Sequence, residues 1–526
     1  MNNILAQHIV EQMIQNGVKE CCLAAGSRNA PLVYALNATN QIKVYNWPEE
    51  RSAAFFAIGR IKATNRPVAI ITTSGTAAAE VLPAAMSAHY LGLPLLMITA
   101  DRPRRFRGSG APQTSEQPGL FGCYAHFELD LADDEKCNLD EWTCKGPAHL
   151  NICFEEPRES ECKMIQVKRN LPDQWLNKPN VFHEEHLERY HNFIQIVKNP
   201  LVVVGALDVK NREIVIQYLL QLGAPVYAEA FSNIREDNRL EHLKITRIDN
   251  IWNTAEKNNY PIDGILRIGE IPTARLWRDL EEKGGQVKVC SISEQPFSGL
   301  SWADVIYTSL EKFFIAACER RLKKDFKFKQ WVEADSLFQA TLLNLLHEEP
   351  FAESSLIHSL SKIISPNSNI YLGNSLPIRE WDLAASHSSR GYFMHASRGV
   401  NGIDGQISTF FGLSDPHKDN WAIIGDLTAL YDMVGPWILP QITDTSVNLI
   451  VVNNGGGQIF SRMYSLPIFT NPHQLNYEHL AHFWKMHYEK WDCIPNNVAS
   501  NHKHRLIEIT PDVTSTDRFW TKFTKL

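Results

Sequence analysis

Two segments in the last third of the chain each end a hydrophobic run with polar residues and glycines. They are IIGDLTALYD (423–432) and LIVVNNGGGQIF (449–460). The separation between Asp426 and Asn454 fits a strand–helix–strand crossover, which would place a carboxylate and an amide oxygen at neighbouring strand ends. Magnesium prefers oxygen ligands of this kind, usually completed by phosphate and water. The three glycines that follow would let the backbone approach a diphosphate closely.

Each segment alone is more commonly an ordinary strand-to-helix turn with a helix cap. The two together, at crossover spacing, favour a metal–diphosphate site. The pairing resembles the GD…NN signature of thiamine-diphosphate enzymes.

A second candidate is the pair Glu49 and Glu50 in NWPEERSAAFFAIGR (46–60), where a polar turn precedes an apolar helix. Acids in a first helical turn commonly just complement the helix dipole, and the segment alone favours that interpretation. In thiamine-diphosphate enzymes, however, a buried glutamate here hydrogen-bonds the aminopyrimidine ring and helps to generate the reactive ylid. Burial would raise the pKa of such a glutamate.

Two further loops follow predicted strands. Ser74, Gly75 and Thr76 open a helix, which suits either an anion or cofactor site or an ordinary N-cap. The fragment 102–107 carries four arginines in an acidic chain. A charge run is usually a solvated face, but arginines beside strand ends also bind carboxylates in bidentate fashion. The loops therefore make carboxylate-rich substrates a reasonable hypothesis.

The elements that must position these residues alternate between short β-branched runs and helical patterns, which predicts α/β domains with doubly wound parallel sheets. A polar stretch at 168–180 reads as a linker, and 329–349 reads as a long helical connector. We predict three domains: 1–170, 181–330 and 350–526. The predicted strands are 21–24, 68–72, 95–99, 201–204, 224–227, 265–268, 369–372, 421–424 and 447–452.

Composition narrows the class of protein. The 526 residues include 52 basic and 59 acidic side chains, and this formal charge of −7 argues against general nucleic-acid binding. The first 17 residues read as an amphipathic helix rather than a signal segment. The most apolar region (67–100) contains Glu80 and His89, so we predict no integral membrane segment. Ten scattered cysteines without a metal-binding spacing predict reduced thiols and a cytoplasmic location.

Longer blocks carry a closer resemblance. GSRNAPL, EERSAAFFAIG, TTSGTAAAEVLPA, GAPQTSEQPG and GPAHLNICFEEP in the first third, with GNSLPIREWD, SRGVNGIDGQISTFFG, GDLTALYD and VVNNGGGQIF in the last, resemble one family of thiamine-diphosphate enzymes. It is the 2-succinyl-5-enolpyruvyl-6-hydroxy-3-cyclohexene-1-carboxylate (SEPHCHC) synthase family of menaquinone biosynthesis. GDL in place of the commoner GDG is typical of it.

The resemblance implies a pyrimidine-binding, a central and a diphosphate-binding domain, with thiamine diphosphate and Mg²⁺ or Mn²⁺ as cofactors. The reaction would be decarboxylation of 2-oxoglutarate and 1,4-addition of the succinyl carbanion equivalent to isochorismate. The family's active sites form between subunits, which implies a homodimer or homotetramer.

The resemblance also implies residue roles. Glu50 would activate the cofactor, Gln113 would lie near the reacting centre, and Asp426, Asn454 and the Gly456 carbonyl would bind the metal, with Asn453 open as an alternative to Asn454. Further cofactor contacts would be Ser74, Gly75, Thr76, Ile403, Gly425, Leu427, Gln458 and Ile459. The substrate contacts would be Ser27, Arg28, Arg102, Arg275, Ser375, Arg379 and Arg398.

One departure concerns the acceptor. The family often has Lys-Arg in a loop of the central domain, where this chain has Ala274 and Arg275. Two alternatives therefore stay open: a thiamine-diphosphate decarboxylase or carboligase with a different acceptor, and a catalytically silent paralogue. The intact set of Glu50, Asp426 and Asn454 speaks against a silent protein.

Overall fold

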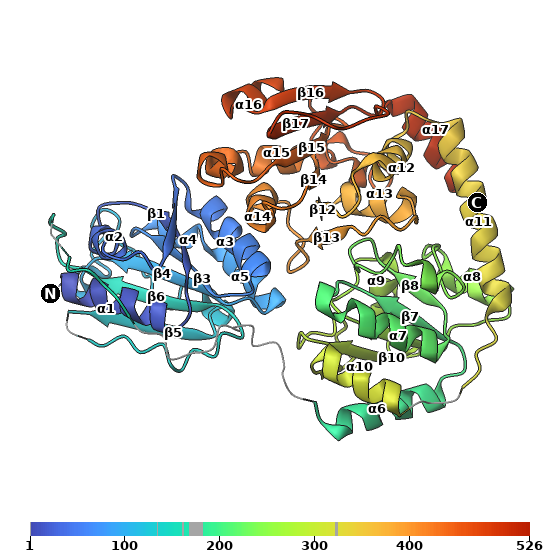
Figure 1. The fold of residues 1–526 in the computed structure, drawn as a ribbon, viewed down its shortest axis with the longest axis horizontal. Helices are drawn as coiled ribbons and strands as arrows, with labels where there is room; N and C mark the ends of the chain where they lie inside the picture. The colour runs from blue at the N-terminus through green and yellow to red at the C-terminus, as the bar shows by residue number, and fades with distance from the viewer. Residues whose placement is uncertain (1, 134, 160–161, 168–181, 321–323, 526) are drawn as a thin grey trace. The chain divides into compact units, whose positions relative to one another are not determined.

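The computed structural model describes residues 2–133, 135–159, 162–167, 182–320 and 324–525. The predicted linker at 168–180 lies outside the described residues. Three parallel sheets with flanking helices confirm the predicted α/β class (Figure 1). Each sheet lies within one of the ranges 1–170, 181–330 and 350–526, whose limits stay a prediction.

The first sheet belongs to the first of two compact units, which comprises 1–177, 397–417 and 427–445. Its strand order is β2-β1-β3-β4-β6-β5, with every pair parallel. The strands are β1 (Glu20–Ala24), β2 (Lys43–Trp47), β3 (Val68–Thr72), β4 (Leu95–Asp101), β5 (Phe127–Ala132) and β6 (Ala148–Cys153). The helices are α1 (Asn2–Gln15), α2 (Ala30–Asn37), α3 (Glu50–Thr64), α4 (Thr76–Ala79), α5 (Leu82–Leu91) and α14 (Gln406–Leu413).

Helices α3 and α14 pack closely because glycines meet where they cross. A Cβ atom added at Gly59 would lie 2.2 Å from the Thr409 carbonyl oxygen, and one at Gly412 would lie 2.8 Å from the Gly59 Cα. Near this crossing, the buried carboxylate of Asp432 accepts hydrogen bonds from the Ser52 hydroxyl (3.0 Å) and the Ser408 N–H (2.7 Å). Residues far apart in the sequence are therefore held together around α3, the helix that begins at Glu50.

The second compact unit contains the other two sheets. The central sheet has the order β11-β10-β9-β7-β8 and the third has β13-β12-β14-β15-β17-β16, again all parallel. The central strands are β7 (Pro200–Val204), β8 (Val226–Ala228), β9 (Gly264–Ile268), β10 (Lys288–Ser293) and β11 (Val305–Tyr307). The strands of the third sheet are β12 (Asn369–Leu372), β13 (Phe393–Ala396), β14 (Asn420–Gly425), β15 (Val447–Val452), β16 (His487–Trp491) and β17 (His504–Ile509).

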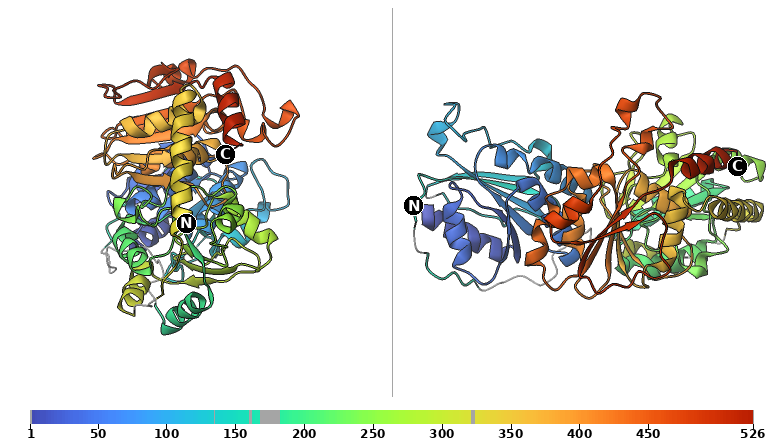
Figure 2. Two further views of the ribbon diagram at one scale, coloured as in Figure 1. Left: turned by 90° about the vertical axis from the view of Figure 1, so that its right-hand side faces the viewer. Right: turned by 90° about the horizontal axis from the view of Figure 1, so that it is seen from above.

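Ten helices of the described chain lie in this second unit: α6 (Glu184–Ile196), α7 (Arg212–Leu222), α8 (Ile251–Lys257), α9 (Arg275–Glu282), α10 (Leu310–Glu319), α11 (Lys329–Glu348), α12 (Glu353–Ile363), α13 (Leu376–Ala384), α16 (Glu478–Phe483) and α17 (Val513–Phe523). Helix α11 is the predicted long connector, and it runs beside the C-terminal helix α17 (Figure 2). Leu342 and Leu346 of α11 pack in one apolar cluster with Phe519 of α17. Helix α15 (Asp426–Tyr431) follows β14 directly.

The order of the third sheet reverses between β12 and β14, and ligands in open parallel sheets bind outside the carboxyl ends of the strands at such a point. Strands β14 and β15 pair in register up to Gly425 and Val452. Asp426 and the Asn453–Asn454 pair therefore leave the sheet side by side, as their spacing predicts. None of the helices among the described residues has the length and apolar character needed to span a membrane.

The glycine crossing yields a stability prediction. Gly59→Ala forces the α3 and α14 backbones apart, so we expect a loss of about 1–3 kcal/mol, or about 2–12 °C in the thermal midpoint. Ala63→Ser, on an exposed position of the same helix, is the control and should shift the midpoint little. Equal midpoints for the two variants in a thermal melt would contradict the close packing described.

Candidate active site

Asp426 is the centre of the predicted metal–diphosphate edge. Its side chain is almost fully buried at 3% exposure, and Oδ2 accepts a hydrogen bond from the Gly456 N–H at 2.8 Å. Gly456 has φ +134°, and a Cβ atom there would lie 2.3 Å from the Thr470 carbonyl oxygen. Only glycine fits this position, and the turn after β15 is thereby fixed against the turn after β14. The Gly456 carbonyl accepts the Gln458 N–H at 2.8 Å.

The two neighbouring asparagines do different things. The Asn453 amide donates to the Leu475 carbonyl (2.8 Å) and to Glu508 Oε1 (2.6 Å), while its oxygen accepts the Gly455 N–H (3.3 Å). The Asn454 amide donates to Glu353 Oε2 at 2.9 Å. Within the described chain the Asn454 side-chain oxygen accepts no hydrogen bond, so it is the one left available for a ligand.

Sequence reasoning missed the residues that hold this edge in place. The buried Tyr477 hydroxyl donates to the Asp426 carbonyl oxygen (2.7 Å), and His473 Nε2 lies 3.2 Å from Asp426 Oδ2. Glu508 accepts the Tyr477 N–H (3.0 Å) as well as the Asn453 amide. These residues carry no local motif, because only the folded chain brings them to Asp426.

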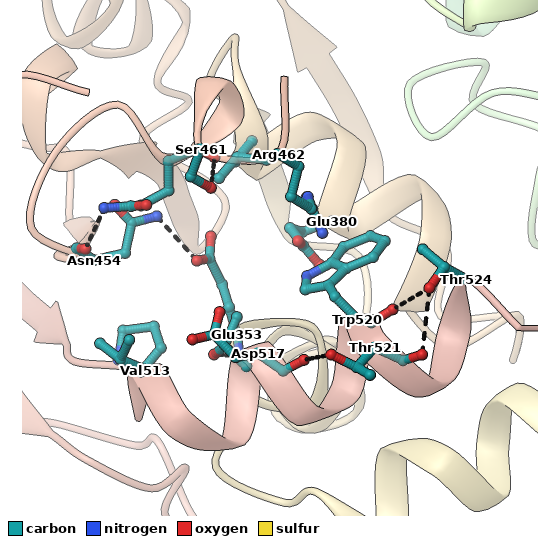
Figure 3. Close-up of a pocket in the computed structure, with 14 residues that line it drawn as sticks. Glu353, Glu380, Asn454, Ser461, Arg462, Val513, Asp517, Trp520, Thr521 and Thr524 are labelled. Atoms are coloured by element: carbon teal, nitrogen blue, oxygen red, sulfur yellow. Dashed lines mark hydrogen bonds between the residues drawn. The ribbon is translucent and has the colours of Figure 1, made fainter. Parts of the chain in front are cut away.

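A cavity of about 370 Å³ lies behind Asn454 (Figure 3). Glu353 and Glu380 line it and are 4% and 2% exposed. The Ser354 hydroxyl donates to Glu380, and the Arg462 guanidinium stacks on Trp520 with its carbon 3.5 Å from the ring centre. Burial raises the pKa of both carboxyl groups, and the neighbouring Glu380 and Asp426 raise that of Glu353 further. The cavity wall is therefore rich in buried carboxyl groups.

The two glutamates at the start of α3 have separate roles. Glu49 is the N-cap, and its carboxylate accepts hydrogen bonds from the Arg51 N–H (3.0 Å) and the Ser52 N–H (2.8 Å). Glu50 is half-buried, and burial raises its pKa, with smaller contributions from Glu49 and Glu80. Helix capping is thus already provided by Glu49, which leaves Glu50 available for chemistry.

The loop at Ser74–Thr76 is built into the first sheet's edge. The Gly75 N–H donates to Gln117 Oε1 (2.9 Å), and the buried Gln117 amide in turn bonds Asn151 and the Ala100 carbonyl. This N–H is therefore committed to the fold rather than to an anion. Gly75 has φ +86°, and its side-chain position faces the Gln113 Cα at 3.3 Å, so the structure brings Gln113 to this loop.

Ser375 and Arg379 meet at the start of α13. Ser375 has φ +72°, an uncommon backbone conformation for a residue with a side chain. One turn later, Arg379 Nη1 donates to the Ser375 carbonyl oxygen at 2.6 Å. Strained residues of this kind are concentrated at functional sites, so the backbone of Ser375 makes this pair a candidate binding site.

The arginine-rich fragment is largely neutralised. Arg104 pairs with Asp130 and Glu135, Arg105 with Glu155, and Arg107 with Asp130 and Asp101. The positive charge of the fragment is thus offset for three of the four arginines, mostly by acids from later in the sequence. Arg102 differs: its Nε donates to the Pro112 carbonyl (2.9 Å), and within the described chain it has no ion pair.

The other predicted substrate residues are dispersed. Arg28 is buried and donates to the Phe154 carbonyl (3.1 Å) and to Glu156 (3.2 Å), beside the exposed Ser27. Arg275 is 71% exposed in its side chain and lies 3.5 Å from Asp279. Arg398 lies within the segment 397–417 of the first unit.

The remaining predicted cofactor residues lie close to the features above. Ile403 is half-buried and precedes Gly405, whose side-chain position is occupied by the Phe55 ring of α3. Gly425 ends β14 and Leu427 follows Asp426 in α15. Gln458 and Ile459 begin a short 3-10 helix, and the Gln458 amide donates to the Asn454 carbonyl at 3.3 Å.

Comparison with known proteins places this arrangement in a class. Residues 4–120 match the family of thiamine pyrophosphate enzymes through its N-terminal TPP-binding domain. The chain is a thiamine-diphosphate enzyme with the three-sheet architecture of that class, and thiamine diphosphate is its cofactor.

Full-length relatives identify the family. The chain is 41% identical to the SEPHCHC synthase of Bdellovibrio bacteriovorus over 99% of this chain and 98% of the relative. It is 34% identical to the synthase of Akkermansia muciniphila (97% and 96%) and 30% identical to that of Lysinibacillus sphaericus (96% and 94%). The protein belongs to the SEPHCHC synthase family.

The separate roles of Asn453, which holds the turn, and Asn454, whose oxygen is available for a ligand, can be tested. Asn453→Ala removes three hydrogen bonds, one of them to the buried Glu508, so we expect the protein to lose about 2–4 kcal/mol of stability, measured by a thermal melt. Asn476→Ala, at an exposed position nearby, should leave the midpoint unchanged. An unchanged midpoint for Asn453→Ala, together with lost cofactor binding, would reverse the assignment of the two residues.

Proposed function

We propose that this protein is a SEPHCHC synthase that decarboxylates 2-oxoglutarate and adds the remaining four-carbon unit to isochorismate. Carbon dioxide leaves in the first step, and the new carbon–carbon bond forms by 1,4-addition in the second. Full-length similarity to the named synthases supports the assignment, because the family motifs occur in both the first and the last third of the chain.

The observation that carries the catalytic proposal is the burial of the side chain of Glu50, which is not the residue that caps the helix. Glu49 caps the helix, and Glu50 is a half-buried carboxyl group with a raised pKa. Thiamine diphosphate, when bound, supplies the nucleophilic carbon and the electron sink for the reaction. Glu50 would hold a proton against the cofactor's ring nitrogen, and Gln113, beside Gly75, would face the reacting groups.

We propose Asp426, Asn454 and the Gly456 carbonyl as ligands of Mg²⁺ or Mn²⁺. The donor set fits: it consists of one carboxylate, one amide oxygen with no other hydrogen bond in the described chain, and one carbonyl oxygen in a turn that only glycine can form. Asn453 fits poorly, because its amide is already bonded at both ends.

Contacts to the rest of the cofactor are proposed for the neighbouring residues of the same loops. Ile403 would support the cofactor as an apolar contact, and the turns after β14 and β15 would contact the diphosphate. These further contacts are Ser74, Gly75, Thr76, Gly425, Leu427, Gln458 and Ile459.

For the substrates, we propose that Ser375 and Arg379 bind the carboxylate of the succinyl side. The contact between them and the strained backbone of Ser375 support this role. We propose Ser27, Arg28, Arg102, Arg275 and Arg398 for the isochorismate side. Of these, Arg102 is the best supported, because its guanidinium forms no ion pair in the described chain.

A carboligase with a different acceptor is the alternative. Ala274 lacks the charge that the family often has there, and Arg275 is exposed and near Asp279. Parallel assays with and without isochorismate distinguish the two: carbon dioxide release from 2-oxoglutarate with no consumption of the isochorismate supplied would favour the alternative.

We further propose a homodimer or homotetramer in the cytoplasm. Exposed apolar side chains between Phe460 and Phe469 support association, since such patches mark interaction surfaces. Ten free cysteines support a reducing compartment.

Glu50→Gln tests the catalytic proposal. Because the amide cannot exchange a proton with the cofactor, we expect kcat to fall about 10²–10⁴-fold with an unchanged thermal midpoint. Isochorismate consumption with 2-oxoglutarate, thiamine diphosphate and Mg²⁺ is the assay. Glu49→Gln is the control: its single side-chain oxygen can still accept one of the two helix N–H groups that Glu49 binds, and we expect activity to be retained. Undiminished activity of Glu50→Gln would refute the proposed role.

Two arginine variants separate the substrates. Arg379→Ala should raise KM for 2-oxoglutarate and Arg102→Ala should raise KM for isochorismate, each by about 10–150-fold, as expected for the loss of a charge-assisted hydrogen bond. Arg105→Ala, from the same loop as Arg102, removes an exposed ion pair with Glu155 and a contact with the Phe106 ring, and should change neither KM. Equal effects of Arg102→Ala and Arg105→Ala would show that the loop acts through its net charge.

A further inference from the structure

The orientation of the Asn454 amide is set from outside the metal-binding edge. An asparagine can bind a cation only through its oxygen, because its nitrogen carries hydrogens that a cation repels. The two ends of the amide are similar in size, so something must hold the nitrogen away from the metal. Glu353 Oε2 accepts the Asn454 Nδ2–H at 2.9 Å, which fixes the nitrogen end toward the cavity (Figure 3).

Glu353 is itself held firmly. It is the first residue of α12, where a carboxylate is favoured by the helix dipole, and it is 4% exposed. Its backbone N–H donates to the Thr516 hydroxyl of α17 at 3.1 Å. The acceptor that orients Asn454 therefore belongs to helix α12 and is hydrogen-bonded to α17, and it is not part of the glycine-rich turn.

Glu380 provides an internal comparison. It lines the same cavity and is buried to the same degree, but its carboxyl group bonds the Ser354 hydroxyl rather than Asn454. A general effect of buried negative charge would involve both glutamates. A positioning effect through Asn454 would involve Glu353 alone.

We propose that Glu353 is a positioning residue for the metal: its hydrogen bond turns the Asn454 oxygen toward the ion without contacting the ion itself. This inference rests on the proposed metal site. Partners in the outer shell of a metal site typically contribute 10–100-fold to metal affinity.

The test is equilibrium binding of Mn²⁺ to the full-length protein with saturating thiamine diphosphate, followed by the loss of the free-ion electron paramagnetic resonance signal. We expect Glu353→Ala to weaken binding about 10–100-fold. Glu353→Gln should stay close to the unsubstituted protein, because its side-chain oxygen can still accept the Asn454 N–H. Glu380→Gln, the matched control, should leave binding unchanged.

Three outcomes would overturn the proposal: unchanged binding by Glu353→Ala, an equal loss in Glu353→Gln, or an equal loss in Glu380→Gln. Asp426→Asn separates this failure from failure of the metal site. If Asp426→Asn binds Mn²⁺ normally, the proposed site is wrong; if it binds weakly while Glu353→Ala binds normally, only the positioning role is wrong. Thermal melts confirm that each variant is folded. If Glu353→Ala is not folded, Glu353→Met takes its place, because it fills the space of the glutamate without an acceptor for the Asn454 N–H, and the same loss of binding is expected.

Discussion

The burial of three carboxyl groups at one edge of the third sheet is the constraint on which the candidate site depends. Glu353, Glu380 and Asp426 are each at most 4% exposed, and burying a charge is costly unless it is compensated. The compensation is local: the Gly456 N–H for Asp426, the Asn454 amide for Glu353, and the Ser354 hydroxyl for Glu380. A divalent cation beside Asp426 would stabilise the ionised form of these carboxyl groups, so the cluster favours the binding of a cation.

The strands could be predicted from the sequence where they are apolar along their whole length. The predicted segments all overlap strands, and the largest displacement is at 224–227, where β8 spans Val226–Ala228. Strand β6 gave no such signal, because His149 and Asn151 interrupt it. In the fold these side chains are buried but bonded, His149 to Thr99 (2.8 Å) and Asn151 to Asp101 (3.1 Å). Buried polar residues with partners are invisible to a search for apolar runs.

The residues of the candidate site likewise fall into those that the sequence predicts and those that it does not. The neighbouring positions of Asp426 and Asn454 follow from two parallel strands and one crossover, which is local information. Glu353, His473 and Tyr477 reach the same edge from other elements, and nothing in their own segments marks them. The arginine fragment shows the converse error, because counting charges in one loop omits the acids that fold onto it, such as Asp130 and Glu135.

Backbone conformation adds evidence that neither charge nor burial provides. A residue with a side chain at φ +72° costs of order 1–3 kcal/mol, a cost that glycine would avoid. Gly456 shows that this edge uses glycine where only the backbone matters. The serine at position 375 therefore implies a role that offsets this cost, either for its hydroxyl group or for its contact with Arg379. The strained serine lies after β12 and the carboxylate of Asp426 lies after β14, so they flank the point where the strand order reverses, which is where such a sheet binds its ligands.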